Sequence, residues 1–346
     1  MFDKTIIRWY IDNKRELPWR NTKDPYCIWI SEIILQQTRI SQGHDYYLRF
    51  IEKFPDVTSL ATASEDEVMK LWQGLGYYSR ARNLHEAACQ IVSLGHFPNS
   101  YEEVKKLKGI GDYTAAAICS FSYEQPYAVV DGNVYRVLSR YLGIETPIDT
   151  AQGKKEFSTI AQDLLDKNQP GLYNQAIMDF GALQCTPQMP NCTNCPLSDS
   201  CLAFHQNRVD VLPIKNHKTK TSNRYFNYIY VRAGKHTYIN KRIDNDIWKN
   251  LYELPLIESD HTLNFDEFIQ KLSHTAWIDS LENITIRCIA KNIKHVLSHR
   301  IIFASLYEII FNKECDESFG PFVRIPVSEI NLYAVPSLIS LLLEKL

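Results

Sequence analysis

The chain has 346 residues, of which 45% are hydrophobic and 23% are charged, and its formal net charge is −2. This composition is typical of a soluble globular protein with roughly two domains, and no internal repeat or low-complexity tract is visible. A net charge close to zero excludes a generic polyanion binder, so any contact with nucleic acid must depend on a local basic surface and on positioned backbone amides.

The N-terminus, MFDKTIIRWYID, is polar and charged within a few residues, which excludes a signal peptide. No apolar run approaches the roughly 20 residues that span a bilayer. We therefore expect a cytoplasmic protein without membrane contact. Its nine cysteines should then be mostly thiols or metal ligands, because disulfides are rare in a reducing compartment.

The first expected helix runs from Lys4 to about Asn13 and precedes a loop with two prolines, LPWRNTKDPY. In this loop Trp19 and Arg20 either contact a substrate or pack over a helix end. The next helix, CIWISEIILQQTRI, is apolar almost all the way round, which predicts burial on most sides. Glu32 lies in its middle, either desolvated in a pocket, with a pKa raised toward that of a general acid, or solvated on a narrow exposed stripe.

Three uncharged residues with hydrogen-bonding side chains, Gln36, Gln37 and Thr38, end this helix and are suited to contacting base edges or sugar-phosphate atoms. Further on lies the loop GLGYYSRAR, in which adjacent aromatics, Tyr77 among them, are followed by arginines. This loop fits stacking on a base with phosphate contact, or else a surface loop with packed tyrosines. Further helices are expected at about 42–54, 64–72 and 81–93.

The central stretch from Leu107 to Asp131 is LKGIGDYTAAAICSFSYEQPYAVVD. Its Gly109-Ile110-Gly111 turn leaves backbone N–H groups uncovered, and the N-terminal end of the following helix, expected at 112–123, adds attraction for a phosphate. An apolar run then brings the Asp131 carboxylate to the start of another helix. The alternative is an ordinary helix-helix turn with a simple N-cap.

Four cysteines follow the next two helices, which are expected at about 153–166 and 172–183. They lie in CTPQMPNCTNCPLSDSC with the spacing C-x6-C-x2-C-x5-C, on short loops without a core pattern. Thiols so close together indicate a metal centre, and the chemistry alone leaves an iron-sulfur cluster and a structural zinc open. The four are Cys185, Cys192, Cys195 and Cys201.

The composition changes from about residue 206, where a basic stretch with few apolar residues is typical of an extended linker. Beyond it the apolar period changes toward that of strands. YFNYIYVRAG and HTYINKR are expected to form a hairpin through Ala233-Gly234, and IRCIA, IIFASLYEIIF and FVRIPVSEI are further strand candidates. With helical patterns at about 265–274 and at the C-terminus, this part is expected to be α+β.

Several long motifs closely resemble MutY-type adenine DNA glycosylases of the helix-hairpin-helix superfamily. They are ISEIILQQT, GLGYYSRARNL, LKGIGDYTAAAI, VVDGNVYRVLSR and NQAIMDFGALQCTP followed by the four-cysteine loop, and they run in one order from about Leu17 to Cys201. NKRIDNDIWKNLYELP and KHVLSHRIIF resemble the Nudix-like domain of the same family more weakly.

The resemblance implies a mainly α N-terminal region with two helical lobes and an iron-sulfur loop, followed by an α+β Nudix-like domain. We expect a glycosylase domain at 1–205 with its cysteine loop at 185–201, a basic linker at 206–223, and an 8-oxoguanine recognition domain at 224–346. The protein is expected to be a monomer, associated with the nucleoid in a bacterium.

In chemical terms the resemblance implies excision of adenine mispaired with 8-oxoguanine or guanine in duplex DNA, after the nucleoside is flipped out of the stack. Glu32 would protonate the adenine ring at N7, and Asp131 would stabilise the developing charge on the sugar, electrostatically or covalently. Amides at the helix N-terminus would keep Asp131 ionised. Asn133 would orient Asp131, and Tyr113 would support the cation.

Other roles are implied in the same way. The four cysteines would bind a 4Fe-4S cluster that places nearby residues against DNA without redox chemistry. The Nudix-like domain lacks the glutamate-rich metal signature after LYELP, so it would bind and not hydrolyse. Adenine and DNA contacts are expected from Arg20, Gln36, Gln37, Thr38, Tyr77, Gly109, Gly111 and Gln175.

The turn Leu297-Ser298-His299 corresponds to the family's Phe-Ser-His turn, which senses 8-oxoguanine. Leucine replaces the aromatic residue that is common in the family as a wedge, and the alternative for His299 is a surface histidine beside Arg300.

Tyr113 separates this chain from endonuclease-III-type relatives, which carry a lysine there that attacks the sugar and cleaves the strand through a Schiff base. They also lack a glutamate at the position of Glu32. We therefore expect a monofunctional glycosylase. The alternatives are a pyrimidine-damage glycosylase-lyase and a catalytically silent iron-sulfur DNA-binding protein.

Overall fold

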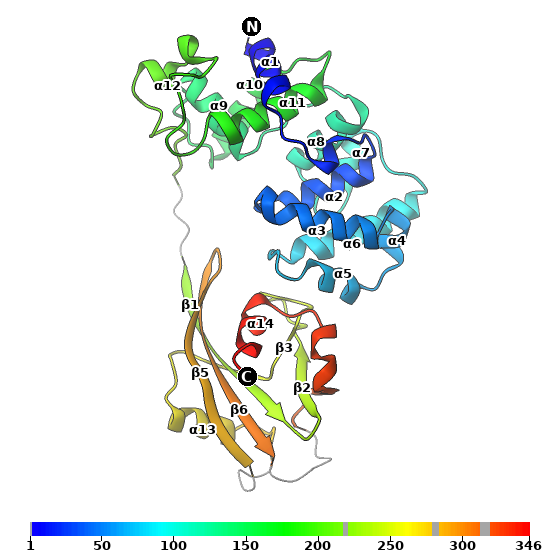
Figure 1. Ribbon diagram of the computed structural model, residues 1–346, viewed down its shortest axis with the longest axis vertical. Helices are drawn as coiled ribbons and strands as arrows, with labels where there is room; N and C mark the ends of the chain where they lie inside the picture. The colour runs from blue at the N-terminus through cyan, green and yellow to red at the C-terminus, as the bar shows by residue number, and fades with distance from the viewer. Residues whose placement is uncertain (1, 217–220, 279–283, 312–318) are drawn as a thin grey trace. The chain divides into compact units, whose positions relative to one another are not determined.

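The computed structural model describes residues 2–216, 221–278, 284–311 and 319–346 (Figure 1). The chain divides into two compact units, one formed by Met1–Thr62 with Asn83–His217 and the other by Ala63–Arg82 with Lys218–Leu346. The sequence-based domain boundaries at residues 205 and 224 place 63–82 in the first domain, whereas these residues belong to the second compact unit. The boundaries stay a prediction. Among the described residues, no helix is both long and apolar enough to cross a bilayer.

In its described part the first unit is helical. Short turns η1 (Pro18–Arg20), η2 (Phe180–Gln184) and η3 (Ser198–Ser200) connect or extend its helices. Helix α6 crosses from the second unit into the first. The helices are α1 (Phe2–Asn13), α2 (Pro25–Leu35), α3 (Ile40–Lys53), α4 (Val57–Thr62), α6 (Ser79–Leu94), α7 (Tyr101–Lys106), α8 (Asp112–Tyr123), α9 (Gly132–Leu142), α10 (Ala151–Leu164), α11 (Pro170–Asp179) and α12 (Leu202–His205).

Helix α2 begins where Asp24 caps it, because the Asp24 carboxylate accepts a hydrogen bond from the backbone N–H of Tyr26 at 2.9 Å. The predicted burial on most sides is found, since eight of its residues are buried. The helix ends at Leu35, earlier than the sequence pattern indicated. Gln36 and Gln37 lie outside it, and Gln37 has a positive φ of 57°, so these side chains are directed by a turn and not by helical periodicity.

The turn before α8 has the predicted glycine geometry. Gly109 has a φ of 74°, and a Cβ at this position would lie 2.7 Å from the Cβ of Asn83, so only glycine fits here without a shift. Helix α8 covers the predicted residues, and α9 starts directly after Asp131. Helix α11 continues into the π-helical turn η2, which leads to the cysteine loop.

The second unit contains helix α5 (Glu65–Trp72) and two sheets, with strand orders β4-β1-β6-β5 and β3-β2-β7. In the larger sheet β1 runs parallel to β6 and antiparallel to β4. The elements are β1 (Ser222–Arg232), β2 (His236–Lys241), β3 (Tyr252–Glu253), β4 (Leu256–Ser259), α13 (Phe265–Ser273), β5 (Ile284–Val296), β6 (Arg300–Phe311), β7 (Val323–Pro326), η4 (Val327–Leu332) and α14 (Ser337–Leu343).

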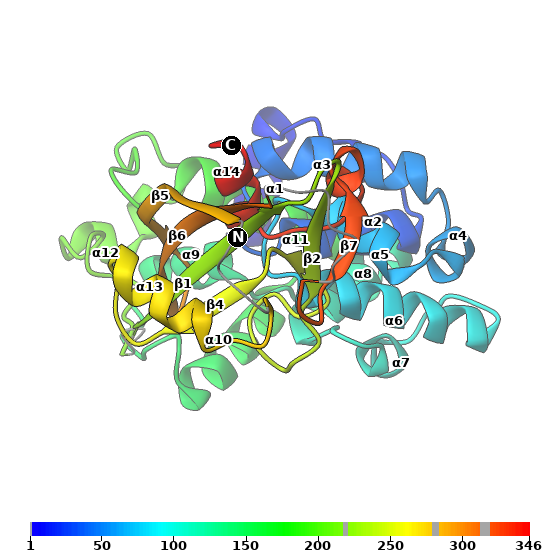
Figure 2. The same cartoon turned by 90° about the horizontal axis from the view of Figure 1, so that it is seen from below.

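Alternate residues of β1 face two separate apolar clusters. Phe226 and Tyr228 pack with Leu338 of α14, whereas Ile229 packs with Phe268 of α13. The two helices therefore cover opposite faces of the sheet, as Figures 1 and 2 show. Burying each of these apolar side chains stabilises the fold by roughly 1.5–3 kcal/mol. The α+β prediction is confirmed.

The predicted hairpin of β1 and β2 is wrong in one respect. The chain does turn through Ala233-Gly234, but an isolated bridge between Ala233 and His236 joins the two segments, and the strands pair in different sheets. The turn residues were readable from the sequence, whereas strand partners depend on residues far away in the chain.

Part of the predicted linker 206–223 packs on the first unit. Leu212 is buried, its carbonyl accepts a hydrogen bond from Nε of Arg140 at 3.1 Å, and the carbonyl of Ile214 accepts one from the N–H of Ile148 at 3.0 Å. Residues 217–220 of this segment lie outside the described residues.

Candidate active site

A cavity of about 820 Å³ opens in the first unit between α2, α8, α9, α11 and the loops that precede and follow them. It collects residues from segments more than 150 positions apart in the chain. Of the residues predicted from the sequence, it is lined by Arg20, Glu32, Gln36, Gln37, Thr38, Tyr113, Asp131, Asn133 and Gln175.

Glu32 projects from the buried helix α2 into this cavity and is only 7% exposed. Burial raises the pKa of its carboxyl group to about 7, since desolvation outweighs the hydrogen bond from Tyr113, and the negative charge of Asp131 acts in the same direction as burial. Arg20 opposes the shift. A carboxyl group with this pKa is a suitable general acid near neutral pH.

Tyr113 lies in the first turn of α8, and its hydroxyl donates a hydrogen bond to Oε2 of Glu32 at 2.6 Å. Burial raises the pKa of Tyr113 well above its ordinary value, so this residue is a neutral hydrogen-bond donor under working conditions. A phenol in this state has no amine and forms no Schiff base.

Asp131 caps helix α9. Its carboxylate accepts hydrogen bonds from the backbone N–H groups of Asn133 and Val134 at 2.9 and 2.8 Å, and from Nδ2 of Asn133 at 2.8 Å. Burial raises the pKa of Asp131 above the usual carboxyl value, and these hydrogen bonds counteract it. The backbone amides lower the pKa of Asp131, as predicted, but burial raises it by more.

Arg136 is a cavity residue that the sequence did not single out. Its guanidinium donates to Oδ1 of Asn133 at 2.8 Å, to the carbonyl of Gly181 at 2.5 Å and to the carbonyl of Cys185 at 2.7 Å. Arg136 therefore connects Asn133, whose side chain donates a hydrogen bond to Asp131, with the first residue of the cysteine loop, Cys185. Helical spacing alone places Arg136 one turn after Asn133, but its partners on η2 are visible only in three dimensions.

Asp179 is a second residue that the sequence did not predict, and it binds two arginines of the cavity lining from outside the cavity. Asp179 is fully buried and accepts hydrogen bonds from both terminal nitrogens of Arg20, at 2.5 and 2.7 Å. Arg15, which also lines the cavity, pairs with the same carboxylate. This double pairing lowers the pKa of Asp179 against the opposing influence of burial. Two of the arginines that line the cavity, Arg15 and Arg20, are thus held by one buried carboxylate.

Three predicted DNA contacts lie outside the lining of this cavity. Gly109 and Gly111 belong to the turn before α8, and Tyr77 belongs to the second unit. Within that unit the Tyr77 hydroxyl lies 2.5 Å from Oγ of Ser298, which joins two residues that the sequence assigned to separate DNA contacts.

In the turn between β5 and β6, Leu297 packs against the apolar cluster on the α14 face of the sheet. Its N–H donates to the carbonyl of Arg300 at 2.8 Å, and the carbonyl of His299 accepts from Ser222 at 3.2 Å. The neighbouring Val296 is 63% exposed. The exposed apolar side chain next to this turn is thus that of Val296, the last residue of β5, which directly precedes the predicted wedge position.

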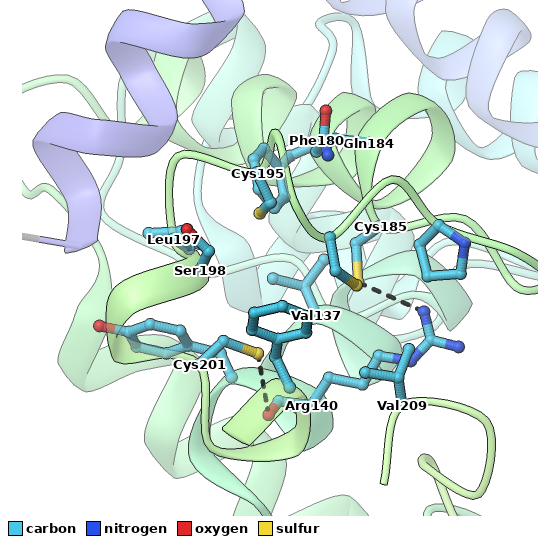
Figure 3. A pocket seen from close by; sticks show the side chains of 14 residues that line it. Val137, Arg140, Phe180, Gln184, Cys185, Cys195, Leu197, Ser198, Cys201 and Val209 are labelled. Atoms are coloured by element: carbon cyan, nitrogen blue, oxygen red, sulfur yellow. Dashed lines mark hydrogen bonds between the residues drawn. The ribbon is translucent and has the colours of Figure 1, made fainter. Parts of the chain in front are cut away.

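The four predicted cysteines line one small cavity of about 30 Å³ together with Arg140 (Figure 3). Nη1 of Arg140 lies 3.5 Å from Sγ of Cys185, and the carbonyl of Arg140 lies 3.5 Å from Sγ of Cys201. Within the described ranges, no three histidine, cysteine, aspartate or glutamate side chains converge closely enough to hold a metal ion. The thiols therefore surround a common space without meeting at one point.

Known protein families and relatives match this chain over most of its length. Residues 30–164 match the HhH-GPD superfamily base excision DNA repair protein model, and residues 227–345 match the NUDIX domain model. An adenine DNA glycosylase of Buchnera aphidicola subsp. Baizongia pistaciae (strain Bp) is 34% identical over 320 residues, which cover 90% of this chain and 87% of that protein.

The chain belongs to the adenine DNA glycosylase family.

A second adenine DNA glycosylase, from Mus musculus, is 42% identical over 216 residues, which cover 59% of this chain and 42% of that protein. The structure of a thermostable thymine-DNA glycosylase covers 59% of this chain and 95% of its own, with 29% identity and a TM-score of 0.55. As a member of the adenine DNA glycosylase family, the protein is a hydrolase that removes adenine from DNA in base excision repair. The predicted family, fold class and enzyme class are confirmed.

Proposed function

We propose that this enzyme removes adenine paired with 8-oxoguanine or guanine in duplex DNA, and that the flipped nucleoside enters the 820 Å³ cavity. One observation carries the proposal: Glu32 and Asp131 line the same cavity, in surroundings that differ as the two chemical roles require. Burial raises the pKa of both carboxyl groups, but Asp131 also accepts three hydrogen bonds at the N-terminus of α9 that counteract the rise, whereas Glu32 accepts one from Tyr113.

Glu32 supplies the proton. With a pKa of about 7, a sizeable fraction of this carboxyl group is protonated at neutral pH. Transfer of the proton to N7 of adenine makes the base a neutral leaving group when the N-glycosidic bond breaks. The hydroxyl of Tyr113 then stabilises the carboxylate that remains, through the hydrogen bond at 2.6 Å.

Asp131 stabilises the positive charge that develops on the sugar as the bond to adenine breaks. Its three hydrogen bonds from Asn133 and Val134 hold the carboxylate in one orientation. Water adds to the sugar carbon and loses a proton, which yields free adenine and an abasic site.

The enzyme is proposed to be monofunctional, because Tyr113 stands where lyase relatives carry their nucleophilic lysine. Sodium borohydride traps a Schiff base as a stable adduct, so incubation with an A:8-oxoguanine duplex and borohydride should give no more covalent complex than a lysine-free control protein. A strong trapped adduct would exclude this assignment.

The cysteine loop fits a 4Fe-4S cluster better than zinc. A structural zinc needs four sulfurs at about 2.3 Å from one ion, whereas a cluster spreads its irons over a larger space and takes one thiolate from each cysteine. The arrangement of Cys185, Cys192, Cys195 and Cys201 around a cavity supports the second case. When bound, the cluster would hold the loop in one conformation. The loop reaches the active-site cavity through Pro187.

In the second unit, Ser298 and His299 are proposed to recognise 8-oxoguanine. The support is their place in the turn between β5 and β6, beside Tyr77. Replacing both with alanine should reduce the preference for A:8-oxoguanine over A:G duplexes, measured as the ratio of single-turnover rate constants. An unchanged ratio would remove the assignment.

The decisive experiment for the whole proposal is single-turnover adenine release from an A:8-oxoguanine duplex by the wild type and by Glu32→Gln. Loss of a general acid costs typically 10²–10⁴ in rate. A wild type that binds the duplex without releasing adenine would instead identify a silent DNA-binding protein.

A further inference from the structure

Gln175 lines the active-site cavity, and its side chain is held from behind by a residue outside that cavity. The hydroxyl of Tyr10 donates a hydrogen bond to Oε1 of Gln175 at 2.9 Å. Tyr10 belongs to α1, is 2% exposed and lies 165 positions away in the chain. The reaction as proposed uses no group on α1, so this contact calls for a separate explanation.

A carboxamide has an accepting end and a donating end, and the orientation of the group decides which end a ligand meets. Because Oε1 of Gln175 is engaged by Tyr10, Nε2 is the end turned away from it. An amide N–H₂ in that position donates to an acceptor such as a purine ring nitrogen. Free rotation of the same amide would present the accepting end for part of the time.

Tyr10 is itself fixed by charged neighbours. The guanidinium of Arg20 lies over its ring, 5.6 Å from the centroid. Arg20 in turn is bound in bidentate fashion by Asp179. A planar guanidinium held at both terminal nitrogens keeps a defined position over an aromatic face, so the phenol hydroxyl has little freedom to leave Gln175.

We propose that Tyr10 is a positioning residue for base recognition: it fixes the Gln175 amide so that the cavity offers a hydrogen-bond donor to the flipped adenine. This inference rests on the proposed entry of adenine into the cavity. It adds a residue on α1 that acts only through Gln175 and touches no reacting atom.

Tyr10→Phe tests the inference, because it removes one hydroxyl and keeps the ring under Arg20. The plateau rate constant for adenine release at saturating enzyme should fall about fivefold, which corresponds to a net hydrogen bond of about 1 kcal/mol. The dissociation constant for a duplex without a mispair should stay unchanged, since phosphate contacts dominate such binding.

Tyr173→Phe is the matched control. Tyr173 lies in α11 close to Gln175 in sequence and is equally buried, but its hydroxyl has no hydrogen-bond partner among the described residues. This variant should release adenine at the wild-type rate. A loss equal to that of Tyr10→Phe would show that deleting any buried hydroxyl here disturbs the fold, and would overturn the proposal.

A double-mutant cycle separates positioning from structure. In a Gln175→Ala background the Tyr10→Phe change should have no further effect on the plateau rate constant, because the amide that Tyr10 orients is gone. A repeated fivefold loss there would contradict action through Gln175. If Tyr10→Phe matches the wild type, the inference fails while the proposed function stands, and if the wild type releases no adenine, the proposed function fails first.

Discussion

Two carboxyl groups face one cavity and differ in their surroundings, which is the central feature at the scale of single residues. Glu32 is buried on the apolar helix α2 and receives one hydrogen bond from Tyr113. Asp131 receives three, two of them from the backbone of α9. Hydrogen bonds to a carboxylate favour its charged form, and desolvation favours its neutral form. In the proposed mechanism the same chemical group therefore serves as acid in one place and as anion in the other.

The pKa of Glu32 sets a pH dependence for the reaction. In the proposed mechanism the protonated form of Glu32 is the active one, so the single-turnover rate constant should be highest below pH 7 and should fall, toward tenfold per pH unit, as the pH rises above about 7. The measurement is adenine release from an A:8-oxoguanine duplex between pH 6 and 9 at saturating enzyme. The residual rate of Glu32→Gln should lack this alkaline decline. A wild-type rate that is flat or rising above pH 7 would contradict the role of Glu32.

The same burial makes Glu32 a cost to folding at alkaline pH. Its pKa is about 7 in the folded state against 4.5 as the ordinary value, so its contribution to stability is fully present below pH 4.5 and is lost as the pH rises through 7. At pH 8 the loss amounts to roughly 3 kcal/mol.

Glu32→Gln removes this titration. Its free energy of unfolding, measured with urea, should exceed that of the wild type at pH 8, and the difference should shrink toward pH 5. A difference that does not change with pH would mean that Glu32 is solvated in the folded protein.

At the scale of elements, helix α9 and the turn η2 approach so closely that their contact depends on glycine. A Cβ on Gly181 would lie 2.6 Å from the Cβ of Asn133 and 3.0 Å from its carbonyl oxygen. The carbonyl of Gly181 also accepts a hydrogen bond from Arg136. The position of Asn133, and through it that of Asp131, therefore depends on an element 48 positions further along the chain.

Gly181→Ala should push Asn133 away and reduce the rate constant of adenine release at least tenfold, with a destabilisation of about 1–3 kcal/mol from overpacking. Gly95→Ala is the control: Gly95 has a φ of 76° and lies outside the cavity lining, so alanine there is strained and lowers stability without touching Asn133. The control should keep wild-type activity. Equal activity of both variants would show that Asn133 does not depend on this contact.

At the scale of the whole molecule, the cysteine loop joins distant parts of the first unit. Arg136 and Arg140 of α9 bind carbonyl groups from Cys185 to Pro187, and Arg140 also binds Leu212 near the end of the unit. A centre that holds the loop therefore also holds one wall of the active-site cavity. Burial raises the pKa of Cys195 to about 11, so a bound metal must displace a proton from this thiol.

The purified protein should contain iron and acid-labile sulfide in equal amounts, and Cys195→Ser should lose both, melt at a lower temperature and release adenine more slowly. Cys288→Ser, at an exposed position of β5, should keep the iron content and the activity. Zinc in place of iron, or a full iron content in Cys195→Ser, would contradict the proposed cluster.

Local patterns predicted much of this molecule. The apolar circumference of α2 predicted a helix buried on most sides, with a desolvated Glu32 as one of two alternatives. The run before Asp131 predicted a carboxylate at a helix start. Both features depend on residues within one or two turns. The exit of Gln36 and Gln37 from α2 was missed, since a turn with positive φ overrides helical periodicity. The pairing of β1 with β6 instead of β2 was missed as well, because strand partners are chosen by long-range packing.

The sequence by itself determined the family, the helical and α+β character of the two parts, and which side chains carry acids, amides and thiols. Only the tertiary structure decided which of these side chains share a cavity and which residues outside the cavity bind them. Arg20 meets Asp179 across 159 positions and Tyr10 meets Gln175 across 165. Such contacts leave no periodic trace in the sequence, because they arise from the packing of whole helices, and the pKa of Glu32 follows from that enclosure.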